Sequence, residues 1–100
     1  MPLLDIRVLP LGTQTPGVSG FITAAVKVVE QSGLSYEVTP MSTCVEGSLD
    51  ELLDVARRMH EATFGDGVQR VVTIMTIDDR RDEDETLDEK VSRVTDGLQQ

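Results

Sequence analysis

The chain has 100 residues, of which 39% are hydrophobic, 27% are charged and 3% are aromatic. This predicts a single globular domain over residues 1–100 with an aliphatic core, and it excludes a disordered tail. Eighteen acidic and nine basic residues give a net charge of −9, which repels nucleic acids and anionic membranes, so neither is expected as a partner. A lone cysteine, with neither a leader-like start nor a long apolar run, favours a cytoplasmic protein.

Residues 1–33 carry the pattern of a strand followed by a helix. Alternation of apolar and charged residues predicts a strand whose buried face is formed by Leu4, Ile6 and Val8. Pro10 and Gly12 are expected to end this strand. From about residue 18 to Ser32 the spacing predicts a helix, with Gly33 placed to stop it. Its apolar stripe is Val18, Phe21, Ile22, Ala25, Val26 and Val29.

Two short strands and a second helix are predicted next. Leu34–Thr39 and Met41–Glu46 alternate in polarity on either side of Pro40, as a hairpin or as one bent strand. Ser48 and Glu51 form a capping box that opens the second helix. Its expected apolar stripe is Leu49, Leu52, Leu53, Ala56 and Met59, reaching Thr63 or Phe64.

The segment Arg70–Asp78 is rich in β-branched residues and predicts a long, well-buried strand. Both of its faces are apolar: Val71, Met75 and Ile77 lie on one, Val72 and Ile74 on the other. Because two helices cover only one side of a four-stranded sheet, the second apolar face predicts packing against another subunit.

A second capping box, Thr86 with Glu89, predicts a C-terminal helix. Its narrow apolar stripe suits a helix laid over a partner or a sheet edge, and consists of Leu87, Val91, Val94 and Leu98. The order of these predicted strands and helices along the chain predicts an α+β fold, a ferredoxin-like βαββαβ antiparallel sheet with an added C-terminal helix.

Two stretches resemble catalytic motifs and are interpreted as ordinary loops. Residues 12–19 approach a P-loop, but the lysine is missing, so we favour a strand-to-helix turn with Thr15 as N-cap and Pro16 in the first turn. Residues 82–86 match the DxDxT pattern of aspartate phosphatases, but Arg80 and Arg81 separate them from the strand, and a solvated loop is favoured.

Candidate catalytic residues are few. His60 lies near the apolar stripe of the second helix and is interpreted as a partly buried structural residue rather than a base. Cys44 is interpreted as a small buried residue rather than a nucleophile, and no metal site is predicted. Polar groups that could converge on a small ligand are Thr13, Gln14, Ser19, Ser42, Thr43, Glu46 and Asp78.

Several segments together resemble one family. These are residues 9–13 (LPLGT), 32–41 (SGLSYEVTPM), Glu46-Gly47 and residues 77–81 (IDDRR). Over nearly the whole chain the sequence resembles the thiamine-binding proteins also called the UPF0045 or DUF77 family. The resemblance implies a ferredoxin-like subunit that assembles through its sheets into homodimers and homotetramers. It also implies binding of thiamine or its hydroxymethylpyrimidine moiety without turnover and without a required cofactor.

The resemblance carries Thr13, Met41, Thr43 and Glu46 over as ligand-binding residues. The aminopyrimidine ring of thiamine needs an apolar slot with hydroxyl and carboxylate partners, and the thiazolium cation of thiamine needs negative potential. Stacking partners are limited to Tyr36, Phe21, Phe64, Met41 and Met75. Two alternatives stay open: an assembly or regulatory protein with no thiamine role, and a small enzyme that uses Cys44 or His60.

Overall fold

The computed structural model describes residues 1–12, 19–65, 67–82 and 86–98. Its elements in chain order are β1 (Leu3–Leu11), α1 (Ser19–Ser32), β2 (Tyr36–Val38), β3 (Thr43–Glu46), α2 (Leu49–Thr63), β4 (Arg70–Asp78) and α3 (Leu87–Leu98). The strands form one sheet in the order β2-β3-β1-β4, with every neighbouring pair antiparallel. This confirms the predicted α+β class with a C-terminal helix added, and the order agrees with a ferredoxin-like arrangement.

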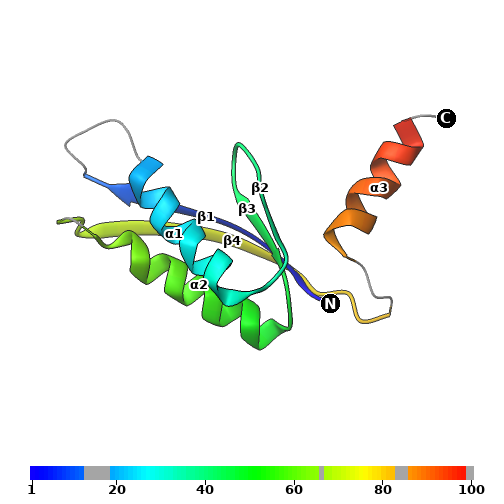
Figure 1. Cartoon of the computed structure of the whole chain (residues 1–100), viewed down its shortest axis with the longest axis horizontal. Helices are drawn as coiled ribbons and strands as arrows, with labels where there is room; N and C mark the ends of the chain where they lie inside the picture. Colours follow the sequence, from blue (N-terminus) through cyan, green and yellow to red (C-terminus); the bar gives the residue numbers. More distant parts are fainter. Residues whose placement is uncertain (13–18, 66, 83–85, 99–100) are drawn as a thin grey trace.

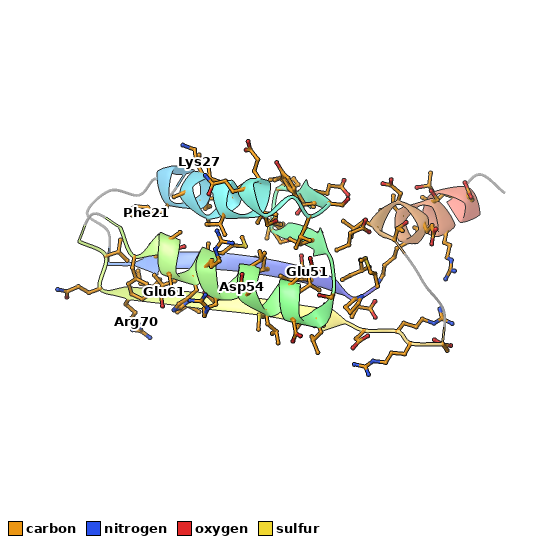
Figure 2. The ribbon with its side chains drawn as sticks, turned by 60° about the horizontal axis from the view of Figure 1, so that its bottom comes forward. Phe21, Lys27, Glu51, Asp54, Glu61 and Arg70 are labelled. Carbon is orange, nitrogen blue, oxygen red and sulfur yellow. The ribbon has the colours of Figure 1, made fainter. Side chains whose placement is uncertain are left out.

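Helices α1 and α2 lie side by side on one face of the sheet (Figure 1). They bury alternate residues of β1 and β3 in a core formed by Leu4, Ile6, Val8, Ala25, Val29, Val45, Leu52, Val55, Ala56 and Met59. The charged residues Lys27, Asp54 and Glu61 of these helices are exposed to solvent (Figure 2). One face of the sheet is therefore the inner face of an aliphatic core.

The opposite face, called the open face below, is crossed by no helix in the described part of the chain. Paired residues of antiparallel strands point to the same side, so the register of β1 with β4 and β3 assigns its members. Its apolar residues are Leu3, which is buried at 7% exposure, and Leu9, Leu11, Val72 and Ile74. Its charged residues are Asp5, Arg7, Glu37, Glu46, Arg70 and Asp78.

The local signals read from the sequence are confirmed at several boundaries. Ser48 caps α2: its side chain accepts a hydrogen bond from the Glu51 amide, and the Glu51 carboxylate accepts one from the Ser48 amide. Gly33 has a φ of 77° just after α1, a conformation that favours glycine. Of the two arrangements predicted for residues 34–46, the antiparallel pairing of β2 with β3 shows the hairpin.

The prediction that Pro10 and Gly12 end β1 is right for Gly12 but wrong for Pro10, because β1 runs through Pro10 and ends at Leu11. Strand β3 pairs with β1 only from Leu3 to Ile6, whereas β4 pairs with it from Leu3 to Leu11. Beyond Ile6, β1 is therefore a sheet edge on the β3 side. A proline whose missing N–H faces a free edge costs no ladder hydrogen bond.

The prediction that β4 is well buried is also wrong for this chain. Ile74 on the open face is 43% exposed, and Met75 on the helix face is 44% exposed. Ile74 is exposed because no helix of the described residues covers the open face, and Met75 is exposed because β4 lies at the edge of the sheet, beside β1 alone.

The predicted stripe of α2 needs one further correction. Leu49 and Leu53 are exposed, at 36% and 42%, whereas Val55 is buried at 2%. The buried positions are Leu52, Val55, Ala56, Met59 and Thr63. The stripe is thus rotated toward Val55 because α2 packs on α1 as well as on the sheet.

The C-terminal helix α3 forms where the capping box predicts it, with Thr86 and Glu89 exchanging hydrogen bonds. It extends beyond one end of the sheet (Figure 1). Its stripe residues Val91, Val94 and Leu98 are 55%, 66% and 81% exposed. The Leu87 amide donates to Glu46 Oε2 at 3.1 Å, and Lys90 pairs with Asp78, which holds its first turn against the sheet.

We expect Ser48→Ala to lower the free energy of unfolding by about 1 kcal/mol, because it removes the side-chain acceptor at the start of the buried helix α2. Urea denaturation followed by circular dichroism measures this. Gln31→Ala, on the exposed side of α1, is the control and should change stability by less than about 0.5 kcal/mol. Equal effects of the two substitutions would contradict the capping role.

Candidate functional site

An apolar groove of about 240 Å³ lies between α1, the second half of β1 and the loop that joins β2 to β3. Its walls include Ile22 and Val26 of α1, and its floor includes Val8 of β1. The loop residues that line it are Thr39, Pro40, Met41 and Ser42. The groove exists because β3 stops pairing at Thr43 while β1 continues, so the sheet is one strand narrower there.

The loop beside the groove is held by its own hydrogen bonds. The Thr39 hydroxyl accepts hydrogen bonds from the amides of Met41 and Ser42 and donates to the Ser42 carbonyl. The Thr39 amide also donates to the Ser42 carbonyl at 2.8 Å. These bonds fix the turn around Pro40, so Met41 is presented at the mouth of the groove with 70% of its surface exposed.

A polar cluster on the open face adjoins the groove. The Ser42 hydroxyl donates to Asp5 Oδ1, and Cys44 Sγ lies 3.5 Å from the same oxygen. Burial raises the pKa of the half-buried Cys44 thiol above its ordinary value, and the Asp5 carboxylate raises it further. Cys44 is therefore held as a neutral thiol, which is a poor nucleophile.

The structure divides the four predicted ligand-binding residues. Met41 and Thr43 both line the groove, and Thr43 is buried at 5% exposure. Glu46 lies on the open face, three residues along β3, where its carboxylate accepts from the Leu87 amide. Thr13 lies outside the described residues. The groove thus brings together Met41 and Thr43 but not Glu46.

Glu46 belongs to a second concavity, called the acidic hollow below, of about 470 Å³ between the β2–β3 hairpin and α3. Its lining residues include Tyr36, Glu37, Glu46 and Asp88. Three acidic residues beside one concavity favour a cation, whereas the apolar groove suits an uncharged ring.

The remaining candidates have structural contacts. His60 Nδ1 lies 2.6 Å from Thr73 Oγ1, and its ring meets Phe64 edge-on at 5.3 Å, as expected of a partly buried structural histidine. Asp78 pairs with Lys90. Asp82 pairs with Arg80 at 2.7 Å, while the middle of the DxDxT stretch lies outside the described residues, as does most of the loop after Gly12.

Residues 1–12, 19–65, 67–82 and 86–98 contain no cluster of three or more histidine, cysteine, aspartate or glutamate side chains that could hold a metal ion. Within the same ranges, no helix has the length and apolar character needed to span a bilayer.

Several groove residues were missed by the sequence analysis. Val8 was assigned only to the core, and Arg7 was seen only as part of the polar side of an alternating strand. The signal that could have found them is Pro10 inside an otherwise regular strand, because a proline there indicates a free strand edge.

Residues 4–95 match the family described as Thiamine-binding protein. The UPF0045 protein YqgV of Bacillus subtilis is 40% identical, and the match covers 99% of each chain. The chain belongs to the thiamine-binding protein family. A UPF0045 protein of Methanothermobacter thermautotrophicus is also 40% identical, with 90% of this chain and 92% of that one covered.

Solved structures of this thiamine-binding family share the fold. A hypothetical protein from Methanocaldococcus jannaschii superposes with a TM-score of 0.87 at 30% identity, covering 94% of this chain and 95% of that one. A DUF77 domain from Bacillus cereus superposes with a TM-score of 0.82 at 38% identity, and the match covers 92% of this chain and 88% of that one. A Thermotoga maritima protein named for thiamine biosynthesis or salvage superposes with a TM-score of 0.78 at 27% identity, and the match covers 93% of this chain and 97% of that one.

We expect Asp5→Asn to lower the pKa of Cys44 toward its ordinary value, because the carboxylate charge that opposes the thiolate is removed while burial remains. The pH dependence of alkylation by iodoacetamide measures this. At neutral pH the variant should react faster than the parent. Glu61→Gln, which removes a distant exposed carboxylate, is the control, and identical profiles for both variants would contradict the assignment.

Proposed function

We propose that this protein binds thiamine, or its hydroxymethylpyrimidine moiety, in the groove and does not turn it over. The observation that carries the proposal is the groove itself, an apolar slot that contains Met41 and Thr43 in a chain of the thiamine-binding family. A Thermotoga maritima relative by structure is named for thiamine biosynthesis or salvage, which supports the same ligand class.

The size and lining of the groove favour the pyrimidine ring over the whole ligand. Its volume of about 240 Å³ is below the roughly 300–1,000 Å³ of pockets that enclose drug-sized molecules. Ile22 and Val26 offer an apolar wall, and the Met41 thioether offers a polarizable contact for a ring face. The thiazolium part of thiamine then lies outside the groove, where the net charge of −9 favours a cation.

A binding role fits the state of the candidate nucleophile and base. The pKa of Cys44 is raised, so little thiolate forms at neutral pH. His60 Nδ1 is engaged with Thr73, and neither residue lines the groove. Catalysis by either residue would first require these contacts to break.

We expect Thr43→Val and Met41→Ala each to weaken binding of hydroxymethylpyrimidine, by about three- to tenfold in Kd. The first removes a hydroxyl with little change in shape, and the second removes the thioether contact. Isothermal titration calorimetry of the parent and the variants measures the effect. Glu46→Gln is the matched comparison and should bind like the parent.

The opposite pattern, in which only Glu46→Gln weakens binding, would place the ligand in the acidic hollow. Absence of saturable heat from the parent with both thiamine and hydroxymethylpyrimidine would contradict the proposed function. Product formation detected by chromatography after incubation with either compound would contradict the non-catalytic role.

We also propose that the protein functions as a homo-oligomer, a homodimer or homotetramer formed through its open face. The exposed large apolar residues of that face, Leu9, Leu11 and Ile74, lie at one end of the sheet together with Arg7 and Arg70. Asp5, Glu46 and Asp78 lie toward the other end. A second copy in the antiparallel orientation brings the basic end of each chain onto the acidic end of its partner. Charge complementarity and apolar burial therefore both favour self-association.

We expect Ile74→Asp to dissociate the oligomer and Met75→Asp to leave it intact. The two residues are neighbours with nearly equal exposure, 43% and 44%, but they lie on opposite faces of β4. Sedimentation velocity at micromolar concentration measures the assembly state. A monomeric parent, or dissociation by both variants alike, would contradict assembly through the open face.

A further inference from the structure

Within the part of the chain that the structure describes, the main chain of β1 has an unpaired edge at the groove. The direction of its N–H and C=O groups follows from the hydrogen bonds of the β2–β3 hairpin. The Glu46 amide donates to the Ser35 carbonyl on the β2 side of β3. Since N–H and C=O groups alternate sides along a strand, the main-chain groups of Val45 and Thr43 point the other way, to β1. Their partners there are Leu4 and Ile6.

The same alternation continues along β1 past the end of β3. If Leu4 and Ile6 direct their main-chain groups toward β3, then Val8 and Pro10 direct theirs to the same side. Among the residues that the structure describes, no strand pairs with β1 on this side, because the register with β3 stops at Ile6 and Thr43. Pro10 has no N–H, so Val8 is the residue that offers both a donor and an acceptor to this edge.

These two groups of Val8 face the groove in a nearly buried setting. Val8 is 6% exposed and lines the groove together with Arg7 and Leu9. Within the described ranges no hydrogen bond to another loop, turn or side chain uses them. Buried main-chain polar groups nearly always have a partner, so a donor and acceptor side by side in an apolar groove point to a ligand.

We propose that Val8 recognises the aminopyrimidine ring through its main chain. The exocyclic amino group donates to the Val8 carbonyl, and the adjacent ring nitrogen accepts from the Val8 amide. The ring then continues the plane of the sheet where β3 ends, with Ile22 and Val26 of α1 covering one of its faces. This inference rests on the proposed function and deepens it, because it names the atoms that distinguish an aminopyrimidine from other small rings.

The position of the hairpin loop favours a small ring over an added peptide strand. Thr39, Pro40, Met41 and Ser42 line the groove opposite β1, and their own hydrogen bonds hold that loop in place. A peptide strand that extended the sheet along β1 would have to displace these loop residues, whereas a single ring fits between the loop and β1.

The first test compares 4-amino-5-hydroxymethyl-2-methylpyrimidine with its 4-oxo analogue by calorimetry. The analogue has nearly the same shape, but it presents an acceptor and a ring N–H donor in the reverse order. Both Val8 groups would then face groups of their own kind. A site built on a donor–acceptor pair rejects such a ligand, and we expect a Kd weaker by about 30-fold or more.

The second test measures amide hydrogen exchange by nuclear magnetic resonance with and without the aminopyrimidine. We expect saturating ligand to slow exchange of the Val8 amide at least about tenfold, because the ligand becomes its hydrogen-bond partner. The Leu9 amide is the internal control: it points to β4, where it is already in the ladder, and should change little.

The outcomes separate this inference from the proposed function. If the aminopyrimidine binds but its 4-oxo analogue binds equally well, or the Val8 amide gains no protection, recognition by Val8 is overturned and the binding function stands. If neither thiamine nor the aminopyrimidine binds, both are overturned.

Discussion

The unequal lengths of the strands that flank β1 are the constraint on which the rest of this structure depends. β1 has 9 residues and pairs with β4 along its whole length, but β3 has only 4 residues. The second half of β1 therefore has a neighbour on one side only. This single mismatch makes Pro10 acceptable inside the strand, opens the groove beside Val8, and leaves the turn around Pro40 as the opposite wall.

The one-sided helix layer is the second consequence of a small α+β domain. With α1 and α2 both on the inner face, the aliphatic core is complete around Leu4, Ile6 and Val29. The open face keeps exposed apolar residues such as Leu9 and Ile74 at one end. A chain with this little aromatic material gains burial mainly by covering that face, which is why we propose self-association alongside ligand binding.

The two proposals use different surfaces of the same strand. The inner residues of β1 hold the core, its main-chain edge faces the groove, and its outer residues belong to the open face. Asp5 connects the last two, because it accepts the Ser42 hydroxyl beside the groove and lies on the open face. Assembly through that face would therefore also stabilise the loop that carries Met41.

The sequence by itself determined the element order, the capping boxes at Ser48 and Thr86, the end of α1 at Gly33 and the membership of the family, because these depend on local periodicity, turn chemistry and motifs. It misjudged Pro10, the burial of β4 and the stripe of α2, because each depends on which neighbours an element has in space. Only the tertiary structure separated Glu46 from Met41 and Thr43. It alone showed that the free edge, which Pro10 only hints at, includes Val8, since main-chain direction at a sheet edge depends on where the neighbouring strand ends.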